Sequence, residues 1–142
     1  MNRIANRIAR LGLAGSVALL SVLPAAAKAS PGGAVESWSA MADIPAPDLL
    51  RLIEELPVSA EATQDQPYCA SDDEIAFTLR HDFAEEVIVT AGAEGTELWA
   101  SDIMGTWSVV APREDDTSCI IASGVGYTTD REAEVYYSSL GF

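Results

Sequence analysis

Apolar side chains recur at helical spacing in the middle of the chain. In the stretch CASDDEIAFTLRHDF, Ile75, Leu79 and Phe83 follow one another every four residues, which predicts the buried face of an amphipathic helix. Ser71 and Glu74 have the spacing of a capping box, in which each side chain accepts a hydrogen bond from a free backbone N–H. We therefore expect a helix that begins just after Ser71.

Two weaker helical patterns flank this segment. PDLLRLIEELPV begins with Pro47 and Asp48 and should end at its final proline. Its apolar residues at helical spacing are Leu49, Leu52, Ile53 and Leu56. Near the carboxyl terminus, TTDREAEVYYSSLGF offers Thr129 as an N-cap and predicts a short helix that carries Tyr136 and Tyr137.

The second half of the chain changes to the pattern of β-strands. Four short apolar runs, at 85–91, 96–101, 105–111 and 118–127, are separated by polar turns. Strands joined by short turns pair with their neighbours, so we expect a four-stranded antiparallel meander. The helix after Ser71 is the natural cover for one face. The expected fold class is therefore α+β, with one amphipathic helix packed on this meander.

The aromatic residues of these strands allow two interpretations. Trp99 and Trp107 lie on successive strands, and Tyr127 ends the fourth. If the three side chains share the face away from the helix, they form an exposed aromatic surface of the kind used for binding. If they face the helix, they belong to the core, and we favour the core for at least one tryptophan.

The first 29 residues have the organisation of a secretory signal peptide. MNRIANRIAR is basic, LGLAGSVALLSVL is apolar, and PAAAKA supplies the small residues that a signal peptidase recognises. The apolar run is shorter than the roughly 20 residues that a membrane-spanning helix needs, so a cleaved signal explains it better than an uncleaved anchor. We expect cleavage of residues 1–29 after Ala29, or alternatively after Ala27, and a periplasmic or secreted protein that is not held at the membrane.

The rest of the chain is expected to divide into a linker and one domain. Residues 30–47 are rich in proline, glycine and small polar residues and are predicted to form a flexible linker. Trp38 lies within this linker, either docked on the domain or marking a short structured turn. Residues 48–142 then form one small α+β domain, with its core in 69–127.

Loss of the signal peptide would make an acidic chain more acidic. It takes away four of the eight basic residues and no acid, which leaves 22 acidic residues, four arginines and a net charge of −18. Nucleic acids and anionic membranes require a cationic surface, so both are excluded as partners. The acidity is typical of a solvated surface; the alternatives are a basic protein partner or a weakly bound divalent cation.

Cys69 and Cys119 both lie in the exported part. In an oxidising compartment two cysteines predict one disulfide bond, which we expect to fix the helix to the fourth strand. Two cysteines and a single histidine do not supply the four ligands of a structural zinc site, and no cofactor is expected.

The sequence offers no recognisable set of catalytic residues. His81 is the single histidine, with Asp82 beside it, but no GxSxG motif is present, and helix ends commonly carry histidine. Adjacent carboxylates are abundant, yet glycosidase chemistry needs two of them across a cleft. Glu114, Asp115 and Asp116 offer oxygen ligands without the spacing of a calcium-binding loop, so at most weak Ca²⁺ binding is expected.

A pattern of short motifs resembles a group of small exported proteins of alphaproteobacteria. It consists of a cysteine before a helix, then LWAS at 98–101, GTWS at 105–108, a polar turn, and CIIASG at 119–124. The resemblance covers residues 69–127 and departs from the group in the turn at 111–116, which reads APREDD where the group has Pro-Asp-Gly. It implies export, a Cys69–Cys119 pair and a helix-plus-sheet domain, and it implies no activity.

Together these features lead us to expect an exported, non-catalytic domain with a binding or structural role. The alternative is a small periplasmic hydrolase that uses His81 and neighbouring acids. An exposed His81 outside any pocket would count against the hydrolase, and an apolar surface that carries Trp99 and Trp107 would favour a binding domain.

Overall fold

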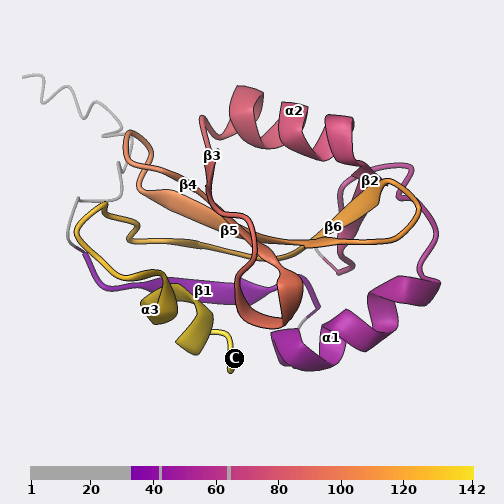
Figure 1. Cartoon of the computed structure of the whole chain (residues 1–142), viewed down its shortest axis with the longest axis horizontal. Helices are drawn as coiled ribbons and strands as arrows, with labels where there is room; N and C mark the ends of the chain where they lie inside the picture. The colour runs from indigo at the N-terminus through magenta and orange to yellow at the C-terminus, as the bar shows by residue number, and fades with distance from the viewer. Residues whose placement is uncertain (1–32, 42, 64) are drawn as a thin grey trace, which may run out of the picture.

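The computed structural model describes residues 33–41, 43–63 and 65–142, and these form three layers (Figure 1). An antiparallel sheet of six strands lies in the middle of this part of the chain. Helix α2, Asp72–Asp82, covers one face of the sheet, and helices α1, Ala46–Leu52, and α3, Ala133–Ser138, cover the other. The expected α+β class is confirmed, but the second layer of helices was not predicted.

The meander predicted for the second half is present. Its strands are β3, Glu86–Val89, β4, Glu97–Ser101, β5, Thr106–Pro112, and β6, Thr117–Val125. Each pairs antiparallel with the next. A short 3-10 turn, η1, Ile53–Glu55, continues directly from α1, and a second, η2, Ala93–Gly95, lies between β3 and β4.

The predicted number of strands is wrong, because two more strands pair with β6. Strand β1, Glu36–Ser39, pairs with residues 122–125, and strand β2, Tyr68–Ser71, pairs with residues 117–120. The two short strands therefore follow one another along the same edge of β6 and satisfy backbone groups that would otherwise be left unpaired. The segment expected to be a flexible linker, residues 30–47, contains β1 and the start of α1. The predicted signal peptide, residues 1–29, lies outside the described residues.

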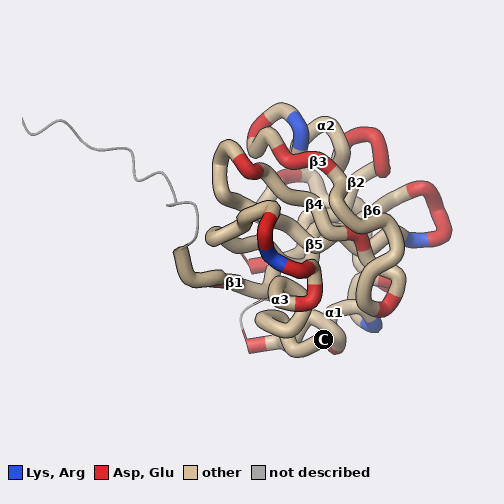
Figure 2. The backbone as a smooth tube through the Cα atoms, turned by 60° about the vertical axis from the view of Figure 1, so that its left-hand side comes forward, with Lys and Arg blue, Asp and Glu red and all other residues tan. Residues whose placement is uncertain are grey.

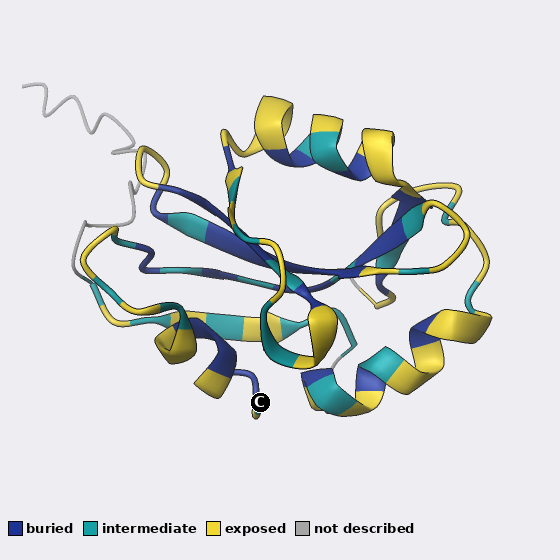
Figure 3. Cartoon of the chain, in the orientation of Figure 1, coloured by how far each residue is buried: buried dark blue, intermediate teal, exposed yellow. Residues whose placement is uncertain are grey.

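Helices pack on both faces of the sheet, and this decides where the aromatic residues lie. Trp99 packs beneath α2 with Ile75 and Leu79, whereas Trp107 lies on the opposite face with Tyr136 of α3. Successive positions along paired strands point to opposite faces, so two tryptophans one step apart in register occupy different cores. Figure 3 shows the inner sides of the helices buried against the sheet and their outer sides exposed.

The predicted start of α2 is confirmed in one of its two capping contacts. Ser71 Oγ accepts a hydrogen bond from the backbone N–H of Glu74 at 3.3 Å. The Glu74 carboxylate does not return to the cap; it accepts a hydrogen bond from the Tyr68 hydroxyl at 2.6 Å instead. The carboxylate thus ties the first turn of α2 to the preceding strand.

The buried apolar face of α2 is shorter than predicted. Ile75 and Leu79 are buried, but Phe83 follows the last helical residue and is 44% exposed. Ala84 adopts a left-handed conformation with φ of 52°, which turns the chain from the helix toward β3. Phe83 therefore projects from the end of α2 instead of continuing its buried stripe.

Helix α1 also departs from its predicted face. Leu49 and Ile53 are buried against the sheet, whereas Leu52 is exposed. The carbonyl groups of Ile53 and Leu56, at the end of the helical segment, accept hydrogen bonds from the Arg113 guanidinium at 2.9 and 2.6 Å. A cation from the β5–β6 loop therefore closes the carboxyl end of this segment.

Helix α3 begins at Ala133, after Glu132 as its N-cap residue, and not at the predicted Thr129. Its two tyrosines are buried. The Tyr136 hydroxyl accepts a hydrogen bond from the backbone N–H of Thr128 at 3.0 Å and lies 3.2 Å from the carbonyl oxygen of the same residue. This buried hydroxyl is satisfied by backbone groups, as burial requires.

The Cys69–Cys119 disulfide is present, but it does not join helix to sheet as expected. The two residues lie directly opposite one another on β2 and β6, with their Cα atoms 4.0 Å apart. Both are fully buried in the core beneath α1, on the face away from α2. The bond therefore secures the short strand β2 against the sheet, and holds α2 only through that strand.

We predict that Gly124→Ala destabilises the protein by about 2 kcal/mol, as overpacking of a rigid site does. A methyl group at this position would lie 2.3 Å from the carbonyl oxygen of Glu36 and 2.4 Å from the ring of Trp107. Neither β1 nor the buried indole can move aside without losing contacts. Urea denaturation measures the loss; an alanine at Gly95, where a Cβ meets nothing within 4 Å but φ is 79°, separates overpacking from backbone strain.

Candidate functional site

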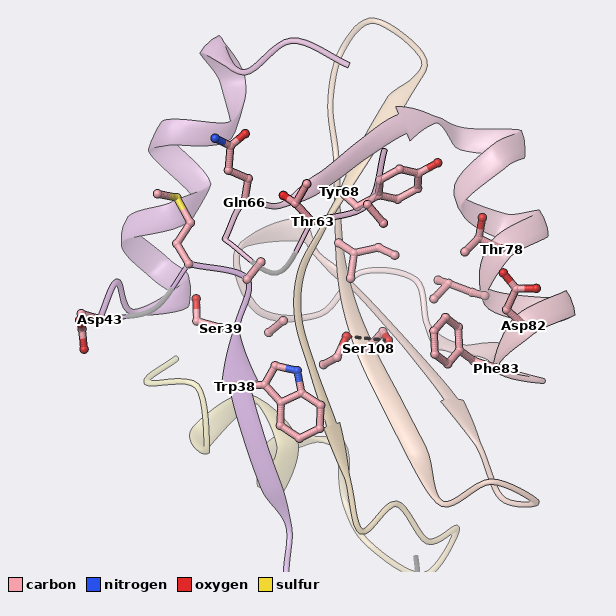
Figure 4. A pocket seen from close by; sticks show the side chains of 17 residues that line it. Trp38, Ser39, Asp43, Thr63, Gln66, Tyr68, Thr78, Asp82, Phe83 and Ser108 are labelled. Atoms are coloured by element: carbon pink, nitrogen blue, oxygen red, sulfur yellow. Dashed lines mark hydrogen bonds between the residues drawn. The ribbon is translucent and has the colours of Figure 1, made fainter. Parts of the chain in front are cut away.

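A groove of about 1000 Å³ opens on the α2 face of the sheet, between α2 and β1 (Figure 4). Helix α2 packs over Trp99 and Val110 and does not extend to the end of the sheet where β1 lies. The sheet face between α2 and β1 is therefore left uncovered. A volume of this size is at the upper end of the range for sites that bind small molecules.

The strand register sets a row of four residues, of which Ser108 and Ser123 form part of the floor of the groove, Trp38 lies at one side of it, and Trp99 lies beneath α2 outside the lining. Trp38 of β1 lies opposite Ser123 of β6, Ser123 opposite Ser108 of β5, and Ser108 opposite Trp99 of β4. Residues opposite one another in antiparallel strands share a face, so all four point to the α2 side. The Ser108 and Ser123 hydroxyls are 3.2 Å apart and form a hydrogen bond at the centre of the floor, as Figure 4 shows.

Two aromatic side chains stand on opposite walls. Trp38 comes from β1 and is 54% exposed, and Phe83 comes from the end of α2. Between them the lining is mainly aliphatic, and its apolar members are Ala40, Met41, Ala62, Leu79, Ile120 and Ala122. Exposed aromatic side chains that face a common cavity provide the apolar contact area on which binding sites depend.

One end of the groove is polar. Tyr68, Thr63 and Gln66 line this end. The hydrogen bond from the Tyr68 hydroxyl to Glu74, followed by partial burial and the negative charge of Glu74, raises the pKa of the phenol above its ordinary value. The hydroxyl therefore stays protonated at neutral pH and is committed to Glu74, which fixes the ring that borders the groove.

The charged residues of the lining are all acidic. Asp43 and Asp82 lie at the rim on opposite sides, and no lysine, arginine or histidine is among the 17 lining residues. The Asp82 carboxylate is 3.8 Å from the His81 ring nitrogen, but both side chains are well exposed. The groove thus combines apolar walls with a negative rim.

A buried carboxyl lies next to the floor. Glu85 is 1% exposed, and one of its carboxyl oxygens has no hydrogen-bond partner among the described residues. Burial raises the pKa of Glu85 to about 7, although the hydroxyls of Thr106 and Ser108 partly offset this by lowering it. Glu85 does not line the groove, so its burial bears on the stability of the fold and not on ligand binding.

The aromatic surface considered from sequence is not exposed. Trp99, Trp107 and Tyr127 are each buried, at 5%, 0% and 6% exposure. They do not share a face either, because Trp99 lies beneath α2 and the other two lie on the α3 side. The exposed tryptophan is Trp38. Its neighbours in SWSA are small and mostly polar, so they form no apolar pattern that would predict a strand.

His81 lies outside the groove. Its ring stacks on Phe77 at 4.9 Å between centroids, on the outer side of α2. The shallow depression there is lined by Asp73, Ala76, Phe77, Arg80 and His81, and it contains no serine, threonine or cysteine. The hydrolase alternative gains no support from this position, because no nucleophile in the lining accompanies the histidine.

The acidic β5–β6 loop does not gather its carboxylates around a common point. The Asp115 carboxylate accepts a hydrogen bond from Thr117 and lies 3.7 Å from Arg113 Nε. The Thr117 contact, with a smaller contribution from Arg113, lowers the pKa of Asp115. Across the described residues no three histidine, cysteine or acidic side chains come together as ligands of a metal ion, so the loop offers no support for the weak Ca²⁺ site considered above.

No protein-family model, curated protein or solved structure matches this chain. Within the described ranges, none of the helices has the length and apolar character needed to cross a lipid bilayer.

Proposed function

We propose that this protein is an exported binding domain that holds a small molecule with an apolar body in the groove between α2 and β1. The observation that carries the proposal is the groove itself, with Trp38 and Phe83 on facing walls and a hydroxyl pair on its floor. Sites for small molecules commonly combine an apolar lining with a few polar groups that orient the ligand. A catalytic role is not part of the proposal.

Export is supported by the amino-terminal sequence. Residues 1–29 follow the basic, apolar and small-residue order of a secretory signal. The buried disulfide is consistent with this location, because such bonds persist in oxidising compartments. We therefore place the protein in the periplasm or outside the cell, as part of the same proposal.

The proposal predicts saturable binding of a neutral apolar probe. Phenylnaphthylamine, which fluoresces in apolar surroundings, should bind the purified, oxidised protein with a dissociation constant in the micromolar range. Trp38→Ala and Phe83→Ala should each weaken this binding by about fivefold or more, because each removes aromatic surface from one wall. Fluorescence titration measures the constants.

The matched control is Phe77→Ala, which removes an aromatic side chain that is 62% exposed on the outer side of α2. It should leave probe binding unchanged. Circular dichroism verifies that each variant is folded. If folded Trp38→Ala and Phe83→Ala bind the probe as tightly as the unaltered protein, the groove is not the binding site and the proposal is wrong.

A further inference from the structure

We infer that the ligand of the groove is a small amphiphilic cation, in which an ammonium or guanidinium group is attached to an aromatic or aliphatic body. The inference rests on the proposed function and adds the charge and chemical class of the ligand. It stands on three observations about the groove and its surroundings: the charges at the rim, the positions of the arginines, and the exposed indole of Trp38.

The first observation is the sign of the rim. Asp43 and Asp82 provide the charges of the lining, one near the end of β1 and one on α2, and they lie on opposite sides of the groove (Figure 4). An anionic ligand placed between them would be repelled from both sides. A cation would instead be attracted to either carboxylate. Each close contact in such a solvated site contributes about 1 kcal/mol.

The second observation is where the basic residues lie. Four arginines follow residue 29 in the sequence, against 22 acidic residues. Arg80 pairs with Glu86, Arg113 binds backbone carbonyls at the end of α1 and η1, and Arg131 donates to the carbonyls of Gly33 and Gly126.

Arg51 is on α1, on the other face of the sheet. Figure 2 shows acidic residues over the loops and helices, with few basic residues among them. Among the residues that the structure describes, no guanidinium lines the groove, so none is available there to pair with a carboxylate, sulfate or phosphate group. The general field of the protein also concentrates cations near its surface and disfavours anions.

The third observation is a comparison within one row of the sheet. Trp99 and Trp38 stand at the two sides of the hydroxyl pair, in the same register row. The Arg80 guanidinium lies over the ring of Trp99, 5.1 Å from its centroid. Trp38 lies beyond the reach of α2 and keeps more than half of its surface exposed. An aromatic face attracts a cation through the ring quadrupole, most strongly when the ring is tryptophan.

These features define the complementary ligand. Its apolar body fits between Trp38 and Phe83 over Ile120, and its cationic group lies over the indole or beside a rim carboxylate. The Ser108–Ser123 pair offers a hydroxyl to a polar atom of the body. A purely polar cation would leave the walls without contact, and a neutral hydrocarbon would make no use of the rim.

The test uses three probes that share one ring system and differ in charge: naphthylmethyl-trimethylammonium, naphthylmethanol and naphthoate. Each competes with phenylnaphthylamine for the oxidised protein. We expect the ammonium compound to bind about tenfold more tightly than the alcohol, and naphthoate to bind most weakly. Added salt should reduce the difference in affinity between the ammonium compound and the alcohol, because it screens the attraction to the rim carboxylates.

A pair of double variants locates the charge effect. Asp43→Asn with Asp82→Asn should reduce the preference for the ammonium compound by about threefold or more. Glu54→Gln with Glu134→Gln removes the same two charges from exposed positions outside the groove, and should keep the preference. Loss of the preference in both double variants would show that the overall charge acts rather than the rim, and would overturn the assignment to Asp43 and Asp82.

The remaining outcomes separate this inference from the proposed function. Equal displacement by all three probes, or tightest binding of naphthoate, overturns the charge inference while the groove remains a binding site. Failure of the neutral probe itself to bind at the groove overturns both.

Discussion

Replacement of both cysteines by alanine should lower the free energy of unfolding by about 4 kcal/mol. The disulfide joins residues separated by 50 positions, so its loss restores considerable conformational freedom to the unfolded chain. The folded state also suffers, because β2 is a strand of four residues attached to the edge of β6. A decrease of this size is large against the roughly 5–15 kcal/mol of net stability typical of a single domain.

The measurement is urea denaturation of the unaltered protein, with and without reductant, and of the double variant Cys69→Ala with Cys119→Ala. Reductant should destabilise the unaltered protein and leave the double variant unchanged. Two alkylatable thiols in the native, non-reduced protein would contradict the disulfide. A destabilisation below about 1 kcal/mol would contradict the role given to it in holding β2.

The second large effect concerns the buried carboxyl of Glu85. Its folded pKa of about 7 lies above the ordinary value of 4.5, so the folded state prefers the neutral form. The stability associated with this proton is complete below pH 4.5 and is lost as the pH rises toward 7. The total loss is about 3 kcal/mol, because each unit of pKa difference corresponds to about 1.4 kcal/mol.

Glu85→Gln isolates this contribution from the other acidic residues. The variant carries no titrating proton, so its stability minus that of the unaltered protein should increase between pH 4.5 and 7 and become constant above that range. Denaturation at a series of pH values gives the difference curve. Glu134→Gln, at an exposed position on α3, should give a flat curve. A flat curve for Glu85→Gln as well would show that the carboxyl is not held neutral by burial.

Much of the sheet and its principal helix could be predicted, because their local and tertiary preferences agree. β-Branched residues and polar turns mark β3 to β6, and Ser71 marks the start of α2. The connections between these strands are short, which limits their pairing to neighbours. In these elements the same residues that favour the local structure also provide the buried face.

The strands β1 and β2 could not be predicted on the same grounds. ESWS and YCAS are too short for a period to be detected. They become strands because β6 offers an edge of unpaired backbone groups, which is a tertiary cause. The prediction of a helix-to-sheet disulfide failed for this reason, since Cys69 was assigned to the approach to α2 and not to a strand.

The candidate site is even less visible in the sequence. Its lining comes from β1 and the residues after it, the connection before β2, β2 itself, α2, β5 and β6, and several of these segments are far apart in the sequence. The burial of Trp99 and Trp107 follows from helices on both faces, whereas the sequence indicated a cover for one face only. The sequence around Trp38 predicts no role for it, because only the pairing of β1 with β6 places its side chain beside the groove.

The position of β6 has a consequence for how the molecule assembles. Both amino-terminal strands, β1 and β2, depend on a partner near the end of the chain, so neither has its native neighbour until residues 117–125 are present. The closure of such long loops slows folding, because chain entropy is lost before distant contacts form. The groove between α2 and β1 is therefore among the last parts of the molecule to be completed, and a chain truncated before β6 has no means of forming it.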